Sequence, residues 1–142
     1  MSFITVAQAN AIIAGVVAKA KEAGMKPLTV AVVDAGGALI CFQRSNGAPP
    51  LRPAVAIGKA AGAVGFGVPS RRLGDMAVER PHFVGAVGNL APHGLVPVAG
   101  GVNVVDGEGR IIGAVGVSGD TSDNDEIAAL AGIAAAGLKA QG

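Results

Sequence analysis

Aromatic residues are scarce in this chain, and it has no large excess of positive or of negative charge. It has no Trp and no Tyr, and only four Phe among 142 residues. Aromatic side chains are the usual stacking platform for single-stranded nucleic acids, so the sequence offers little of that surface. The 11 Lys and Arg residues nearly balance the 10 Asp and Glu residues, and no basic stripe could neutralise a phosphate backbone. These absences argue against nucleic acid as a partner.

Disulfides and long hydrophobic runs are also missing. Cys41 is the only cysteine, so it cannot form an internal disulfide, which is typical of a reducing compartment. No apolar run reaches the ~18 residues of a membrane span, since Lys59 divides the longest candidate. The apolar stretch 12–17 has no positive charge before it, unlike a secretory signal. We expect a soluble, cytoplasmic protein with no membrane partner.

Apolar residues are abundant. They make up 51% of the sequence, against 15% charged residues, so we expect one domain spanning 1–142 with an ample core. Much of this content is Ala, Gly and Val, which favours close approach of backbones. Apolar surface in excess of what one core needs is often buried between subunits, so the composition also predicts a homo-oligomer.

The periodicity of the apolar residues predicts an α+β fold. Thr5 and Gln8 form a capping-box pattern before a helix, and the dense β-branched run 28–33 is followed by a turn at 35–37 and a second extended stretch. The interval 81–93 carries both histidines and is expected to be a long irregular stretch. The predicted helices cover 6–23, 53–66, 71–79 and 122–140, and the predicted strands cover 28–33, 38–43, 95–99, 102–105 and 110–117. These elements indicate a five-stranded antiparallel sheet flanked by helices.

An acidic segment, residues 120–126, follows the last predicted strand. Carboxylates at this place complement the partial positive charge and free N–H groups of a helix start. Helix capping is therefore one interpretation, and contact with a ligand is the other.

Lys59 is the first candidate for chemistry. It is the only ionisable residue between Arg52 and Arg71, and it lies on a helix that is otherwise apolar on every side. A buried ammonium must find a partner or lose its proton. Loss of the proton would suit a general base or a Schiff-base amine, whereas pairing would make Lys59 a structural residue.

Arg44 and the two histidines are further candidates. Arg44 ends a strand beside a glycine-containing loop, where its guanidinium could hold a carboxylate in bidentate fashion or pair with a surface acid. His82 and His93 could ligate iron or move protons, although a solvent-facing loop histidine is the commoner case. His82 is the preferred catalytic histidine because Phe83 is next to it.

Two glycine-containing pairs come next. Gly100-Gly101 and Ser118-Gly119 stand at strand ends, where missing side chains let the backbone approach a ligand and donate to an oxyanion. The alternative is turn geometry, since glycine adopts positive φ at little cost.

Several spaced motifs together resemble one known family. They are Ala31-Val-Val-Asp-Ala-Gly-Gly-Ala-Leu39, Phe42-Gln-Arg44, Asn46-Gly-Ala48, Lys59-Ala60, Gly100-Gly101 and Gly113-Ala-Val-Gly-Val-Ser-Gly119, followed by Asp125-Glu126 and Ala131-Gly132. In this order, from about residue 5 to 138, they resemble the GlcG/HbpS family of haem-binding-protein-like domains, which is similar to the PduO C-terminal domain. The family usually has Asp where Asn46 stands, at the expected rim of the ligand pocket.

The resemblance implies a profilin-like layout and cytosolic or secreted oligomers, often octamers. Members have been linked to binding haem or corrinoids, to haem degradation and to catabolic operons for small organic acids. The leading hypothesis is thus a small-molecule-binding protein whose pocket accepts a carboxylated ligand such as haem. In it Arg44 and Lys59 hold carboxylates in a shared cavity, Asn46 and the glycine-containing pairs line the pocket, and His82 or His93 ligates the metal.

The alternative is an enzyme without a redox cofactor. Here Lys59 or His82 acts as acid or base on a small carbonyl or carboxylate compound, as in an isomerase, hydratase or lyase. The lack of Trp and Tyr favours a compact substrate in this case.

Overall fold

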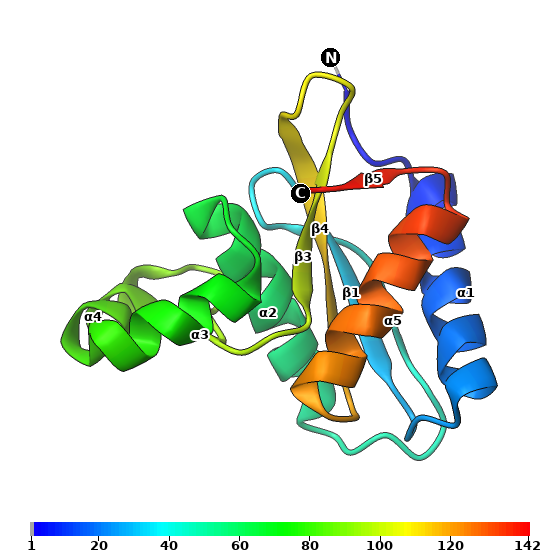
Figure 1. The fold of residues 1–142 in the computed structure, drawn as a ribbon, viewed down its shortest axis with the longest axis horizontal. Coiled ribbons are helices and arrows are strands. Elements are labelled where there is room, and N and C mark those ends of the chain that lie inside the picture. The colour runs from blue at the N-terminus through cyan, green and yellow to red at the C-terminus, as the bar shows by residue number, and fades with distance from the viewer. Residues whose placement is uncertain (1) are drawn as a thin grey trace.

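The computed structural model describes residues 2–142, which form five helices and one five-stranded antiparallel sheet, the α+β fold that the sequence predicts (Figure 1). The strand order across the sheet is β2-β1-β4-β3-β5. In chain order the elements are α1 (Val6–Ala23), β1 (Thr29–Asp34), β2 (Leu39–Arg44), α2 (Arg52–Phe66), α3 (Ser70–Glu79), α4 (Pro81–Leu90), β3 (Gly101–Val105), β4 (Ile111–Ser118), α5 (Ser122–Ala135) and β5 (Lys139–Ala140).

The helices cover the two faces of the sheet unequally. Helices α1 and α5 lie side by side on one face, and α2 lies on the other (Figure 1). The main core is formed between the sheet and the α1/α5 pair, with Ile12, Val16, Val30, Val115 and Ile133 among its buried members. Helices α3 and α4 form an arm that projects away from the sheet on the α2 side.

Helix α1 begins and ends as its sequence predicts. The Thr5 hydroxyl accepts from the Gln8 N–H at 3.1 Å, and the Gln8 side chain accepts from the Thr5 N–H at 2.9 Å. Gly24 ends the helix in the left-handed region, with φ of 67°. The capping box therefore fixes where the chain enters the α1/α5 layer.

Helix α2 is buried because small residues let it approach its neighbours on two sides. A Cβ on Gly116 of β4 would lie 2.0 Å from the Ala56 carbonyl oxygen, so only glycine fits under the helix there. On another side Gly58 makes room for Val96, because a Cβ at Gly58 would lie 2.6 Å from Val96 Cγ2. The apolar helix predicted from the sequence is therefore largely buried within one chain.

The predicted strand 95–99 is wrong. Pro97 offers no N–H to a sheet, and the Val96 N–H donates instead to the Gly58 carbonyl of α2 at 3.2 Å. The apolar run thus packs on the helix and not in the sheet. The fifth strand is β5, in the region predicted to continue the last helix, which ends at Ala135 before Gly137 with φ of 72°.

The interval 81–93 is also more regular than predicted. Residues 81–90 form α4, which opens with Pro81 in its first turn. Phe83 in this helix meets Phe66 of α2 edge to face, with ring centroids 6.2 Å apart. Within residues 2–142 no helix is both long enough and apolar enough to cross a bilayer.

Candidate functional site

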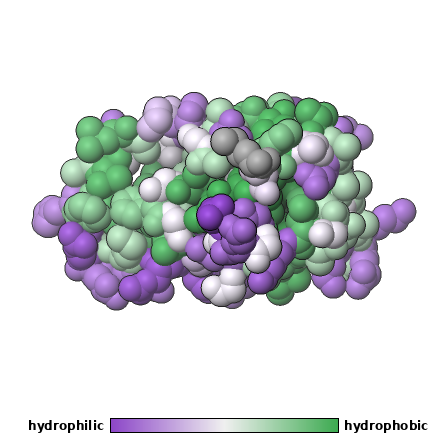
Figure 2. All heavy atoms as spheres, turned by 90° about the horizontal axis from the view of Figure 1, so that it is seen from above, coloured by the Kyte–Doolittle hydropathy of each residue, from purple (hydrophilic) through white to green (hydrophobic). Residues whose placement is uncertain are grey.

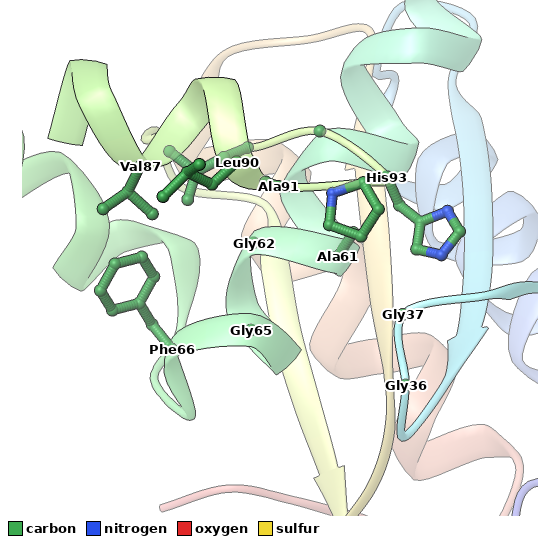
Figure 3. Close-up of a pocket in the computed structure, with 13 residues that line it drawn as sticks. Gly36, Gly37, Ala61, Gly62, Gly65, Phe66, Val87, Leu90, Ala91 and His93 are labelled. Carbon is green, nitrogen blue, oxygen red and sulfur yellow. The ribbon is translucent and has the colours of Figure 1, made fainter.

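A cavity of about 250 Å³ lies between α2 and α4 (Figure 3). The loop after α4 and the turn between β1 and β2 complete its wall. Apolar side chains and glycine backbone make up most of the surface. The lining residues are Gly36, Gly37, Ala61, Gly62, Gly65, Phe66, Val87, Leu90, Ala91, Pro92, His93, Gly94 and Leu95.

His93 is the only ionisable side chain among these lining residues. Figure 3 shows its imidazole beside Gly37, at the end of the cavity opposite Phe66, Val87 and Leu90. A Cβ on Gly37 would lie 3.4 Å from His93 Cδ2, so the ring packs closely on the turn backbone. The cavity is therefore largely apolar, with one imidazole at its edge.

The α3–α4 arm, which forms one wall, exposes large apolar side chains among its charged ones. Leu90, on the cavity rim, is 80% exposed, and Val78 on α3 is 84% exposed. Figure 2 shows apolar atoms at the surface of this end of the molecule. Arg80 covers Phe83, with its guanidinium carbon 4.1 Å from the ring centroid. The arm is thus held to α2 by aromatic contacts and leaves further apolar area uncovered.

The structure separates the two histidines. His82 lies exposed in the first turn of α4 and does not line the cavity, whereas His93 does. Sequence reasoning preferred His82 because of the neighbouring Phe83. That phenylalanine packs against Phe66. No signal in the sequence placed His93 next to the β1–β2 turn, which is distant along the chain.

Lys59 is enclosed in a buried ion pair. Its Nζ donates to Asp125 Oδ2 and to the Val117 carbonyl, each at 3.0 Å, and the two ionic side chains are 2% and 1% exposed. Burial raises the pKa of Asp125 above its usual range, against the opposing effects of the Asp120 N–H and the Lys59 ammonium. The pairing alternative for Lys59 is therefore what the structure shows, and Asp125 is the partner that the sequence did not single out.

The glycines of the two predicted strand-end pairs allow close packing inside the protein. A Cβ on Gly100 would lie 2.8 Å from the Lys59 Nζ, and one on Gly119 would lie 2.4 Å from the Pro27 carbonyl oxygen. The Gly101 N–H donates to the buried Ser70 hydroxyl at 2.7 Å. None of these glycines lines the α2–α4 cavity.

The acidic segment before α5 is used within the chain. Thr121 caps the helix by accepting from the Asn124 N–H at 3.2 Å, and Arg71 of α3 pairs with Asp123 and Glu126. Asp120 accepts from the Lys26 N–H at 2.9 Å, and this bond is the largest cause that lowers its pKa to about 2. Every acid of the segment thus has a partner within the chain, while the cap itself is Thr121 and not an acid.

Arg44, Asn46 and Ser118 lie at one end of the sheet. Arg44 and Asn46 are exposed, while Ser118 is buried and accepts from Arg52 Nη1 at 3.0 Å. None of the three lines the α2–α4 cavity. Arg44 and Lys59 are not brought to one cavity, because the Lys59 Nζ is enclosed with Asp125. No group of three His, Cys, Asp or Glu residues within 2–142 could hold a metal ion.

Comparison with known proteins identifies relatives of the whole fold. Residues 4–134 match the family model described as "Haem degrading protein HbpS-like". A crystal structure of HbpS is similar over 94% of this chain and 90% of that chain, at 29% identity and a TM-score of 0.81. The Klebsiella pneumoniae protein ORFY is 26% identical, over 96% and 92% of the two chains, with a TM-score of 0.85.

A structure described as a PduOC:heme complex shares the fold. Its TM-score is 0.87 over 99% of this chain and 100% of that chain, at 23% identity. No sequence among the curated proteins gives a significant match.

Proposed function

Because the chain belongs to the HbpS-like family of haem-degrading proteins, we propose that its α2–α4 cavity binds haem or another flat tetrapyrrole, with His93 as the iron ligand. The observation that carries the proposal is a single imidazole at the edge of an apolar slot. Bound haem would supply an iron that a neutral imidazole can ligate. The heme named for the PduOC structure gives independent support for this ligand class.

The cavity walls fit one edge of such a ligand. Phe66, Val87 and Leu90 offer apolar contact at the end away from His93, and glycines let a flat group approach the backbone. Cavities that enclose a whole drug-sized ligand run from about 300 to 1,000 Å³. At about 250 Å³, this cavity would enclose only part of a tetrapyrrole. The remainder would lie outside it, next to the exposed Leu90.

A homo-oligomer is part of the same proposal. The uncovered part of the ligand and the exposed apolar side chains of the arm, Val78 and Leu90, would both be sheltered by a second copy of the chain. An octamer and a cytoplasmic location stay predictions from the sequence.

The experiment is a hemin titration followed by Soret absorbance. Wild type is compared with His93→Ala and with His82→Ala, an exposed histidine on α4 outside the cavity. We expect wild type to shift and sharpen the Soret band of free hemin, His93→Ala to change the bound spectrum and weaken binding, and His82→Ala to titrate like wild type. A wild type that leaves the Soret band of free hemin unchanged, or a bound spectrum of His93→Ala identical to that of wild type, would overturn the proposal.

The cofactor-independent enzyme stays a prediction. It relied on Lys59 or His82 as acid or base. Lys59 is 2% exposed and bonded to Asp125, so a substrate could not reach its amine without breaking the ion pair. His82 is accessible but lies outside the cavity. The geometry therefore favours ligand binding through His93.

A further inference from the structure

A second group of polar side chains lies at the end of the sheet, away from the cavity residues. The register pairs Thr29 of β1 with Arg44 of β2 on one side and with Ser118 of β4 on the other. Directly paired residues on antiparallel strands share a face and carry Cβ atoms about 5 Å apart. The three side chains therefore form a row across the face that α2 covers, and Arg52 of α2 reaches the row by donating to the Ser118 hydroxyl at 3.0 Å.

The cations of this row have no counter-charge. Within residues 2–142, neither Arg44 nor Arg52 makes an ion pair, although the chain has ten carboxylate side chains. The acid closest to the row in sequence, Asp120, already accepts from the Lys26 N–H and the Asn124 side chain. Arg44 and Arg52 thus stand at the same strand ends, and neither has an ion-pair partner among the described residues.

A buried hydroxyl in the middle of the row lacks a hydrogen-bond partner. Thr29 is 0% exposed, and its Oγ1 has no partner among the described residues. Buried polar groups are nearly always paired, so an unpaired hydroxyl between two arginines points to a missing acceptor or donor. Helix α2 also begins here with no side-chain cap, and its positive end adds to the field.

We propose that Arg44, Arg52 and the hydroxyls of Thr29 and Ser118 form a site for a compact oxyanion. The shared chemistry is a small group of negatively charged oxygens, presented either by inorganic phosphate or by a small carboxylate. Each guanidinium offers a fork of N–H donors to two such oxygens, and a hydroxyl rotates to donate to a third. The site goes beyond the proposed tetrapyrrole site and shares none of its lining residues.

The test is calorimetric titration of the full chain with inorganic phosphate and, separately, with malonate. The variants are Arg44→Gln and Arg52→Gln. The matched control is Arg72→Gln, an exposed arginine on α3 whose Nη1 lies 3.9 Å from Asp75. We expect wild type and Arg72→Gln to bind one or both anions alike, and each site variant to bind about tenfold more weakly or worse. The preferred anion identifies the source of the oxygens.

A Thr29→Val variant separates a ligand role from a structural one. Removing an unpaired buried hydroxyl should preserve or raise the melting temperature, and in our proposal it also weakens anion binding. The proposal is overturned if wild type binds neither anion, or if Arg72→Gln loses as much affinity as Arg52→Gln. Hemin titration of Arg52→Gln keeps the two sites distinguishable, because its Soret band should match that of wild type.

Discussion

Lys59 shows how one residue can be identified from sequence as unusual while its role depends on the fold. A lone ammonium on an apolar helix requires a partner, and that requirement was readable from the sequence. The identity of the partner was not readable, because Asp125 is one of four acids in its segment and lies 66 residues from Lys59 in the sequence. Only the packing of α2 and α5 around β4 selects it.

We predict that Lys59→Met destabilises the protein by about 3–5 kcal/mol, since it leaves the Asp125 carboxylate buried without its counter-ion. Adding Asp125→Asn should restore part of this loss, because a neutral amide is cheaper to bury than a charge. Urea unfolding gives the free energy of unfolding of the single and the double variant. Lys21→Met, an exposed lysine on α1, is the control. A loss for Lys59→Met no larger than for the control would contradict a stabilising ion pair.

Asp120 gives a pH dependence whose sign follows from its lowered pKa. The unfolded chain has an ordinary value near 3.8, and the hydrogen bond from the Lys26 N–H is the largest cause of a folded value of about 2. Protonation therefore favours the unfolded state, so this contribution to stability is present above about pH 4 and is lost as the pH falls towards 2.

In Asp120→Asn, the free energy of unfolding should therefore depend less on pH between about 4 and 2 than in wild type. Thermal unfolding across this range makes the comparison. Asp75→Asn is the matched control, because its carboxylate is exposed and its one ion-pair partner within residues 2–142, Arg72, lies 3.9 Å away. Equal pH slopes in wild type and Asp120→Asn would show that Asp120 does not carry this linkage.

At the scale of elements, helix α2 links the sheet to the cavity. One side of it approaches β4 at Gly116, another receives Leu95 and Val96, and Gly65 and Phe66 face the cavity. Glycine and alanine content indicated close packing of backbones, and that much was readable from composition. Composition did not show which neighbour packs against each small residue, because these contacts join segments far apart in the chain.

We predict that Gly116→Ala costs about 3 kcal/mol of stability, since its Cβ would lie 2.0 Å from the Ala56 carbonyl oxygen and the helix would have to move. Gly107→Ala, in the hairpin turn, adds a Cβ that meets nothing within 4 Å and serves as the control. Denaturant unfolding gives the free energy of unfolding of both variants and tests this prediction. Equal stability of the two would contradict the close approach of α2 to β4.

The elements themselves were predictable where a local signal defines them. The capping box predicted the start of α1, a dense β-branched run predicted β1, and strand-like runs bounded by glycine-containing turns predicted β3 and β4. The errors came where tertiary contacts decide the conformation. The apolar run 95–99 resembles a strand but packs on α2, and β5 has only two residues, too few for any periodicity to show. The place of His93 was also set by a tertiary contact, because the turn at Gly37 on which it packs is distant along the chain.

At the scale of the whole molecule, the exposed arm predicts self-association. Val78 and Leu90 are 84% and 80% exposed on neighbouring helices. We expect light scattering on wild type to give the mass of more than one chain. A Val78→Asp/Leu90→Asp double variant should be smaller, because two charges would have to be buried in the interface. The matched control is Glu79→Asp, which preserves charge on the same arm. A monomeric wild type would contradict the proposed oligomer.

A flat ligand in the α2–α4 cavity should be displaced by a side chain added to the cavity wall. Gly65 lines the cavity, whereas Gly85 on α4 does not, and a Cβ at either position meets nothing within 4 Å. Leucine favours a helix over glycine at both sites, so neither variant should unfold. The deciding measurement is the Soret-monitored affinity for hemin of Gly65→Leu against Gly85→Leu. Gly65→Leu should bind hemin about tenfold more weakly or worse, while Gly85→Leu should match wild type. Undiminished affinity in Gly65→Leu would contradict a ligand in this cavity.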